Sequence, residues 1–119
     1  MTASELPQLR LLANNGCITY TEHAIDQMLE REISQHAVKQ ILTSQTNQLI
    51  EVQSPSKKAG MQHNDERILI SDPKFPGCII VILIVLIGQA PELRVITVEH
   101  ASDNKWLKNP NDNPWLTRK

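Results

Sequence analysis

Four side chains that can transfer protons or bind anions recur at helical spacing in one short stretch of the chain. They stand at i, i+4, i+7 and i+8, which share one helix face, and they are His23, Gln27, Glu30 and Arg31. A titratable imidazole is therefore expected near a carboxylate and a guanidinium. A metal-independent site that cleaves RNA needs a general base, a general acid and a cation that stabilises the charge on the phosphate. These residue types are present, although the same spacing is also typical of the solvated face of an amphipathic helix.

A second group of charged residues lies on predicted strands and can converge on one face or edge of a sheet: Arg67, Arg94, Glu99 and His100. His100 is a further acid or base candidate, and Arg94 is a further cation for a phosphate. Because side chains alternate along a regular strand, Arg94 and Glu99 are predicted to point to opposite faces. Ordinary charge along a sheet edge is the competing interpretation.

No motif for a metal or a cofactor is visible, so neither is predicted. The four histidines are scattered, none pairs with another at i, i+4, and there is no Cys-x-x-Cys spacing. The aromatic residues, two Trp, one Tyr and one Phe, are too few for a platform that stacks bases. A formal net charge of −1 excludes a strongly basic nucleic-acid wrapper but not a local basic patch.

The length of 119 residues predicts a single domain over 1–119. Apolar residues make up 40% of the chain and charged residues 21%, which argues against intrinsic disorder. The two cysteines, Cys17 and Cys78, are expected to be reduced. The apolar run 78–87 is shorter than the ~20 residues of a membrane-spanning helix, and no signal-peptide pattern is present. We therefore expect a cytoplasmic protein without membrane association.

Apolar residues recur at helical spacing in three N-terminal stretches. Ser4, Thr21 and Ser34 each precede one of these stretches and can cap a helix. The predicted helices run from 5 to a stop at 14–16, from 22 to about 31, and from 35 to about 45. Between the first two helices, residues 18–20 are predicted to be a short extended link.

The periodicity then changes to that of strands, predicted at 49–52, 67–70, 78–87 and 94–99, with a loop at 54–65. The run 78–87 has no polar alternation, so it is expected to be a central strand covered on both faces. Residues 101–119 are expected to be a partly irregular tail with one turn of helix at 103–107. The fold class is therefore α+β: two to three N-terminal helices are followed by a four-stranded, mainly antiparallel sheet.

Residues 20–34 resemble the opening motif of the domain-of-unknown-function family 4258, which reads Thr-x-His-Ala-x-x-Arg-Met-x-Glu-Arg-Gly-Ile-Ser. The matching positions are His23, Met28, Glu30, Arg31 and Ser34, and residues 93–98 look like the closing strand of that family. The sequence departs from the family pattern at three positions. Gln27 replaces an Arg, Glu32 replaces a Gly, and His100 replaces a Tyr.

The resemblance implies a function, because the family is similar to small bacterial toxins of the RelE and BrnT type. Such toxins cleave RNA and are held by a partner antitoxin. The implied acid and base candidates are His23 and His100, and Arg31 and Arg94 would stabilise phosphate charge. Because Gln27 removes a cation, we expect an endoribonuclease of weak or degenerate activity. The alternative is a non-catalytic protein-interaction module that uses the same sheet.

Overall fold

The computed structural model describes residues 1–53 and 66–119, and the loop predicted at 54–65 lies outside the described residues. The elements follow one another as η1 (Ala3–Glu5), α1 (Leu6–Asn14), β1 (Ile18–Tyr20), α2 (Glu22–Glu30), α3 (Gln35–Thr43), β2 (Gln48–Gln53), β3 (Arg67–Ser71), β4 (Ile79–Leu86), β5 (Glu92–His100), β6 (Trp106–Lys108) and β7 (Leu116–Arg118). The three predicted N-terminal helices are therefore confirmed, and the class is α+β.

Two of the helices begin at the residues predicted to cap them. The hydroxyl of Thr21 accepts a hydrogen bond from the backbone N–H of Ala24 at 3.1 Å, and that of Ser34 accepts one from Ala37 at 3.0 Å. Each bond satisfies one of the N–H groups that the first turn of a helix leaves without a partner. The starting points of α2 and α3 are thus fixed by local sequence.

The end of α2 is fixed by a residue in the left-handed conformation, Glu32, whose φ is 57°. The N–H of Ile33 donates to the carbonyl of Met28 at 2.8 Å, and that of Glu32 donates to Leu29 at 3.4 Å. These two bonds form the Schellman motif, in which the left-handed position is usually Gly. Glu32 therefore adopts a strained conformation that directs the chain from α2 into α3.

The sheet contains the four predicted strands in antiparallel order, and it also contains a fifth. Its strand order is β1-β5-β4-β3-β2, and β2, β3, β4 and β5 pair antiparallel with their neighbours. The predicted link at 18–20 is wrong, because it is strand β1, which pairs parallel with β5 in the register Ile18↔Leu93. The prediction of four strands is corrected to a mixed sheet of five. A segment of three residues is too short to show the alternation of apolar and polar residues that is typical of a strand. Its pairing with the edge of β5 is what makes it one.

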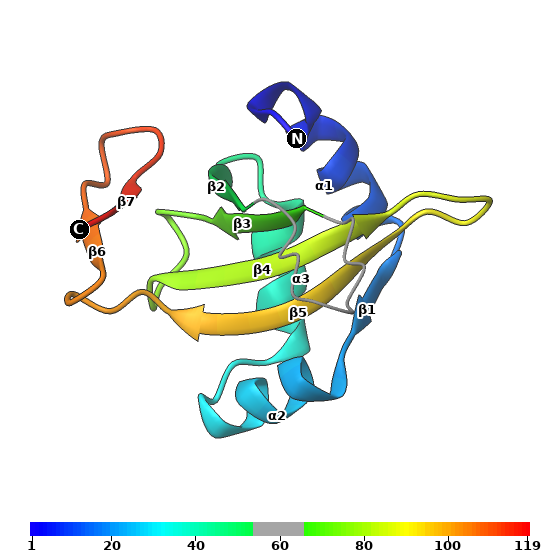
Figure 1. The fold of residues 1–119 in the computed structure, drawn as a ribbon, viewed down its shortest axis with the longest axis horizontal. Helices are drawn as coiled ribbons and strands as arrows, with labels where there is room; N and C mark the ends of the chain where they lie inside the picture. Colours follow the sequence, from blue (N-terminus) through cyan, green and yellow to red (C-terminus); the bar gives the residue numbers. More distant parts are fainter. Residues whose placement is uncertain (54–65) are drawn as a thin grey trace, which may run out of the picture.

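The tail at 101–119 contains two further strands rather than only irregular chain. A single hydrogen-bonded turn at 102–106 is followed by β6 and β7, which pair antiparallel in a separate two-stranded sheet. Trp106, Trp115 and Leu116 of this tail are buried against Leu69 and Ile80. The β6–β7 hairpin therefore supplies a second, smaller core on the opposite face of the sheet from the helix core. Figure 1 shows the hairpin at the end of the sheet where β4 begins and β5 ends.

The apolar run at 78–87 forms β4, which has two strands on either side, so its predicted central position is confirmed. Val81 and Leu83 are fully buried in the core shared with the helices, and Ile80 is fully buried under the hairpin. Burial on both faces is incomplete, because Ile84 and Leu86 are only half-buried. The β6–β7 hairpin packs around Ile80, near the beginning of β4, which limits the cover to that end of the strand.

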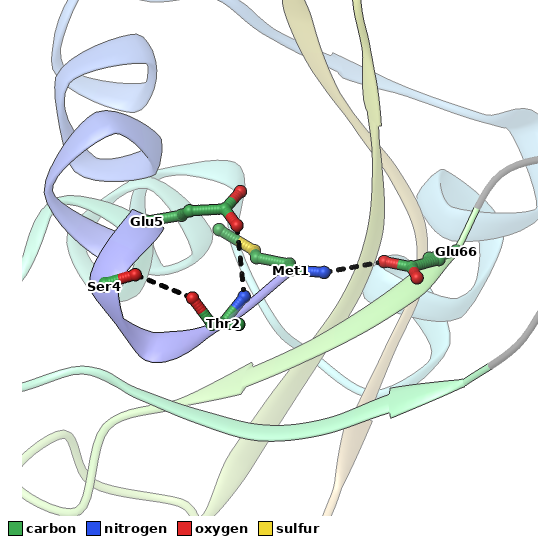
Figure 2. Close-up of polar contacts among 5 residues, drawn as sticks. All are labelled: Met1, Thr2, Ser4, Glu5 and Glu66. Carbon is green, nitrogen blue, oxygen red and sulfur yellow. Dashed lines mark hydrogen bonds and ion pairs between the residues drawn. The ribbon is translucent and has the colours of Figure 1, made fainter.

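The first residues of the chain are tied to the beginning of β3. The terminal ammonium of Met1 donates to Glu66 Oε2 at 2.8 Å, and the N–H of Thr2 donates to Glu5 Oε1 at 3.3 Å (Figure 2). Ser4, predicted as the cap, lies inside the first turn, and its hydroxyl lies 2.7 Å from that of Thr2. These contacts hold η1 and α1 against the sheet.

Candidate functional site

Helix α2 covers the part of the β5 edge that β1 does not reach. β1 pairs with β5 only from Leu93 to Val95, and Figure 1 shows α2 beside the next part of β5. Gln27 Oε1 accepts a hydrogen bond from the N–H of Val98 at 3.3 Å, and Arg31 Nη1 donates to the carbonyl of Val98 at 2.7 Å. Two side chains thus satisfy backbone groups that a neighbouring strand would otherwise bind.

This contact gives Gln27 a structural role that an arginine could not fill. A guanidinium carries donors only, so it cannot accept a hydrogen bond from the N–H of Val98. The amide nitrogen of Gln27 also lies 2.7 Å from Nε2 of His23. His23 therefore has a hydrogen-bond partner, and that partner is a residue at which the sequence departs from the motif that it resembles.

Beyond Gln27, the end of α2 meets the end of β5 and the beginning of the hairpin around an open cleft. This cleft has a volume of about 230 Å³ and is lined by Arg31, Glu99, His100, Ser102, Lys105 and Trp106. We call it the His100 cleft. It contains the cations Arg31 and Lys105, the carboxylate of Glu99 and the imidazole of His100, so its formal charge is +1 with a neutral imidazole, in a chain whose net charge is −1.

His100 is the centre of the cleft's polar contacts. Its Nδ1 lies 2.8 Å from the carbonyl oxygen of Gly77, and its Nε2 lies 3.3 Å from that of Arg31. A neutral imidazole can donate to only one of the two carbonyls at a time, whereas an imidazolium can donate to both. The ring is exposed. Backbone groups from two elements therefore position the ring, and a ligand that bonds to a ring nitrogen must replace one of these carbonyls, of which that of Arg31 is the more distant.

Of the eight residues in the two predicted groups, three line this cleft, and they are Arg31, Glu99 and His100. His23 lies two helical turns before Arg31, which is about 12 Å along the axis. Glu30 is exposed, and within the described residues no hydrogen bond or ion pair to it is found. Arg94 lies near the other end of β5, about 20 Å along the strand from His100, and pairs with Glu92 at 3.0 Å.

A bulge in β5 overturns the prediction that Arg94 and Glu99 lie on opposite faces. Ile82 of β4 stands opposite Thr97 and Leu83 stands opposite Val95, which leaves Ile96 as an extra residue. One extra residue reverses the alternation of side chains beyond it, so Arg94 and Glu99 share a face. No pattern in the sequence indicates a bulge at this position.

Ser102 and Lys105 also line the cleft, although neither residue was predicted from the sequence to belong to a site. Both belong to the turn that leads into β6, in a segment whose irregular composition gave no reason to place it near α2. Trp106 belongs to both the hairpin core and the cleft wall, because it is 3% exposed and yet lines the cleft.

A second cleft lies at the opposite end of β4 and β5. It has a volume of about 280 Å³ and is mostly apolar, with Leu9, Leu12, Ile68, Val85 and Leu93 among its lining residues. Its charged rim consists of Glu5, Glu66 and the ammonium of Met1, which is already bound to Glu66. This apolar cleft therefore lacks the cations that a phosphate site needs.

Comparison of the chain with protein-family models, with curated proteins and with solved structures finds no match. Within residues 1–53 and 66–119, no group of three or more histidine, cysteine or acidic side chains is arranged to hold a metal ion. In the same residues, no helix is long and apolar enough to cross a membrane.

Proposed function

We propose that this protein is an endoribonuclease of the RelE-like toxin type, with weak activity, and that RNA binds in the His100 cleft. The observation that carries this proposal is the meeting of an exposed imidazole, a guanidinium and an ammonium around one open cleft of about 230 Å³. Arg31 and Lys105 supply the positive charge that attracts a phosphodiester, and His100 supplies an imidazole that can donate or accept a proton.

The reaction that suits these groups is attack of a ribose 2′-hydroxyl on the adjacent phosphorus. A general base takes the proton of the 2′-hydroxyl as the 2′-oxygen bonds to phosphorus. The bond between phosphorus and the 5′-oxygen breaks, a general acid gives a proton to that leaving oxygen, and a 2′,3′-cyclic phosphate remains. His100 and Glu99 are the two groups of the cleft that can exchange those protons. Arg31 and Lys105 stabilise the charge on the phosphate oxygens.

The same geometry leads us to expect weak activity. One N–H of Arg31 is committed to the carbonyl of Val98, and His23 does not line the cleft, so no second imidazole assists His100. Loss of a single stabilising donor typically lowers the rate of a reaction of this kind by about 100- to 1,000-fold.

The test uses His100→Ala against the matched control His23→Ala, because the two histidines are both exposed and only one lines the cleft. Each protein is incubated with an end-labelled RNA and with the same sequence in 2′-deoxy form. We expect slow cleavage of the RNA only, lost in His100→Ala and retained in His23→Ala. Equal cleavage by both variants, or cleavage of the DNA, would show that the cleft is not the site.

Binding and toxicity give two further measurements. Lys105→Glu is expected to weaken RNA binding and to reduce its salt dependence, because it removes one phosphate contact. Induced expression in a bacterium is expected to slow growth, with loss of RNA integrity, and an antitoxin-like partner would relieve this effect. Normal growth with intact RNA would contradict the toxin proposal.

One observation favours the alternative of a non-catalytic module that binds a protein partner through the sheet. Ile84 and Leu86 of β4 are large apolar residues that remain half-buried on the outer side of a central strand. If the protein neither cleaves nor binds RNA, and Ile84→Ser abolishes binding of a partner while His100→Ala does not, this alternative replaces the ribonuclease.

A further inference from the structure

The outer face of α2 carries aliphatic side chains that the fold does not cover. Leu29 is 75% exposed and Ile25 is 38% exposed, whereas Ala24 and Met28 form the buried side of the same helix. Ile25 and Leu29 stand at i, i+4, so they form one short apolar stripe.

Carboxylates flank this stripe along one side of the helix and at its end: Glu22, Asp26, Glu30 and Glu32. All of them are exposed, and in residues 1–53 and 66–119 none takes part in a side-chain hydrogen bond or an ion pair. The stripe and its carboxylates, which we call the Leu29 face, carry a formal charge of −4, although the whole chain carries −1.

We propose that the Leu29 face docks a cationic amphipathic segment of a partner protein. Its aliphatic side chains would cover Leu29 and Ile25, and its lysines or arginines would pair with the surrounding carboxylates. Charge complementarity selects this occupant, because an apolar stripe within uncompensated negative charge repels phosphates and acidic segments and attracts cations. RNA is therefore not the ligand of this face.

A second copy of the chain is a less suitable occupant. The hairpin offers an exposed aliphatic residue, Leu107, which is 53% exposed, beside cations. However, Lys108 already pairs with Asp103 at 2.8 Å, and Arg118 pairs with Glu51 at 2.8 Å. Docking of this surface on the Leu29 face would compete with ion pairs that are already formed.

The Leu29 face and the His100 cleft point in different directions from α2. Leu29 and Arg31 are two residues apart, which is about 200° around a helix, and Arg31 reaches Val98 and the cleft. A partner on the Leu29 face therefore leaves the cleft open. The docking inference is independent of the proposed function, and either one can fail alone.

The experiment uses a synthetic helical peptide of about five turns, built from Leu, Lys and Ala with the leucines on one stripe. Isotope-labelled protein is titrated with this peptide and followed by NMR. We expect saturable shift changes at Ile25, Asp26, Leu29 and Glu30, and an affinity that falls with added salt. A peptide of the same composition without an apolar stripe, and one with Glu in place of Lys, are expected to bind weakly or not at all.

Leu29→Gln tests the apolar anchor, and Leu11→Gln is its matched control, because Leu11 is 60% exposed on α1. Leu29→Gln is expected to weaken binding by about tenfold, as for an interface anchor, while Leu11→Gln leaves it unchanged. Both substitutions are on the surface, so thermal unfolding of the variants should match that of the parent.

Three outcomes would overturn the proposal. The first is equal affinity of Leu29→Gln and the parent protein. The second is a set of shift changes confined to the apolar cleft or the hairpin. The third is concentration-dependent self-association in sedimentation that Leu29→Gln abolishes, because this result would make a second copy the occupant.

Discussion

At the scale of single residues, Gln27 shows how a departure from a motif can carry a role of its own. By resemblance, its position should hold an arginine that binds phosphate. In the structure its amide oxygen accepts from the backbone of Val98, which is fully buried, and its nitrogen contacts His23. The residue joins α2 to the edge of β5 by a hydrogen bond, so its contacts give it a structural role and not a catalytic one.

We therefore expect Gln27→Arg to lower the free energy of unfolding without raising the rate of RNA cleavage. The variant leaves the N–H of Val98 without an acceptor, which typically costs about 1–3 kcal/mol for a buried donor. Urea unfolding measures the loss, and Gln27→Glu, which keeps an acceptor, is the control. If the Gln27→Arg protein is as stable as the parent and cuts RNA faster, the absence of an arginine at this position is the better explanation of weak activity.

Glu32 is the second residue whose identity conflicts with its backbone. A left-handed conformation costs a residue with a Cβ about 1 kcal/mol or more, and Gly avoids this cost. We expect Glu32→Gly to raise the free energy of unfolding by about 0.5–1 kcal/mol. Glu32→Ala is the control, because it removes the charge and keeps the Cβ. If Gly and Ala have the same effect, backbone strain at this position is not significant.

At the scale of elements, the β6–β7 hairpin connects the second core to the candidate site. Leu116 is fully buried in that core, and Lys105, which leads into β6, lines the His100 cleft. A ligand in the cleft therefore lies beside the turn before β6, and the position of this turn depends on the packing of the hairpin core against the sheet. Disruption of the hairpin core should alter both stability and the cleft.

We expect Leu116→Ala to lower the free energy of unfolding by about 2–5 kcal/mol, because it leaves a cavity under the sheet. Thr117→Ala, on the exposed side of the same strand, is the control and should stay within about 0.5 kcal/mol of the parent. Urea unfolding distinguishes the two variants. A small effect of Leu116→Ala would mean that the tail is not part of the cooperative fold.

The hairpin also contains an ion pair that makes a pH-dependent contribution. The hydrogen bond from Lys108 to Asp103 lowers the pKa of Asp103 below its ordinary value of 3.8. A lowered carboxyl pKa stabilises the fold above the ordinary value, and this stabilisation is lost as pH falls through the lowered pKa. An NMR titration should show the Asp103 carboxyl returning toward its ordinary pKa in Lys108→Ala. An unchanged midpoint in that variant would contradict the assigned cause.

At the scale of the whole molecule, contacts between distant parts of the chain fix the arrangement of helices on the sheet. Met1 binds Glu66 across 65 positions of sequence, as Figure 2 shows, and Arg31 binds Val98 across 67. These contacts attach α1 and α2 to opposite ends of the sheet. The apolar cleft and the His100 cleft occupy those two ends.

Where the amino group of Met1 is chemically unmodified, its contact with Glu66 predicts that the protein loses stability in alkaline solution. Its hydrogen bond with Glu66 raises the pKa of this group above the ordinary 8.0. The stabilisation is complete below pH 8.0 and is lost as pH rises through the raised pKa. Unfolding curves across this range should show a decline that is reduced in Glu66→Gln. A decline of the same size in that variant would assign the effect to another group.

Local sequence by itself determined the helices and most strands of this protein. Thr21 and Ser34 begin α2 and α3 as predicted, and the apolar run gives the central strand β4, because caps and periodicity depend on near neighbours in the chain. These features fix which segments must be buried. They do not fix which strand edge each segment meets.

Tertiary structure alone decided the remaining features, and these are the ones that build the candidate site. β1 is a strand because it pairs with the edge of β5. Further along the same edge, Gln27 and Arg31 bind backbone groups that a neighbouring strand would otherwise bind. β5 also contains the bulge at Ile96. The turn before β6 then brings Lys105 to His100. Each of these outcomes satisfies backbone groups or apolar surface left open by a distant element, so the local pattern of residues could not reveal it.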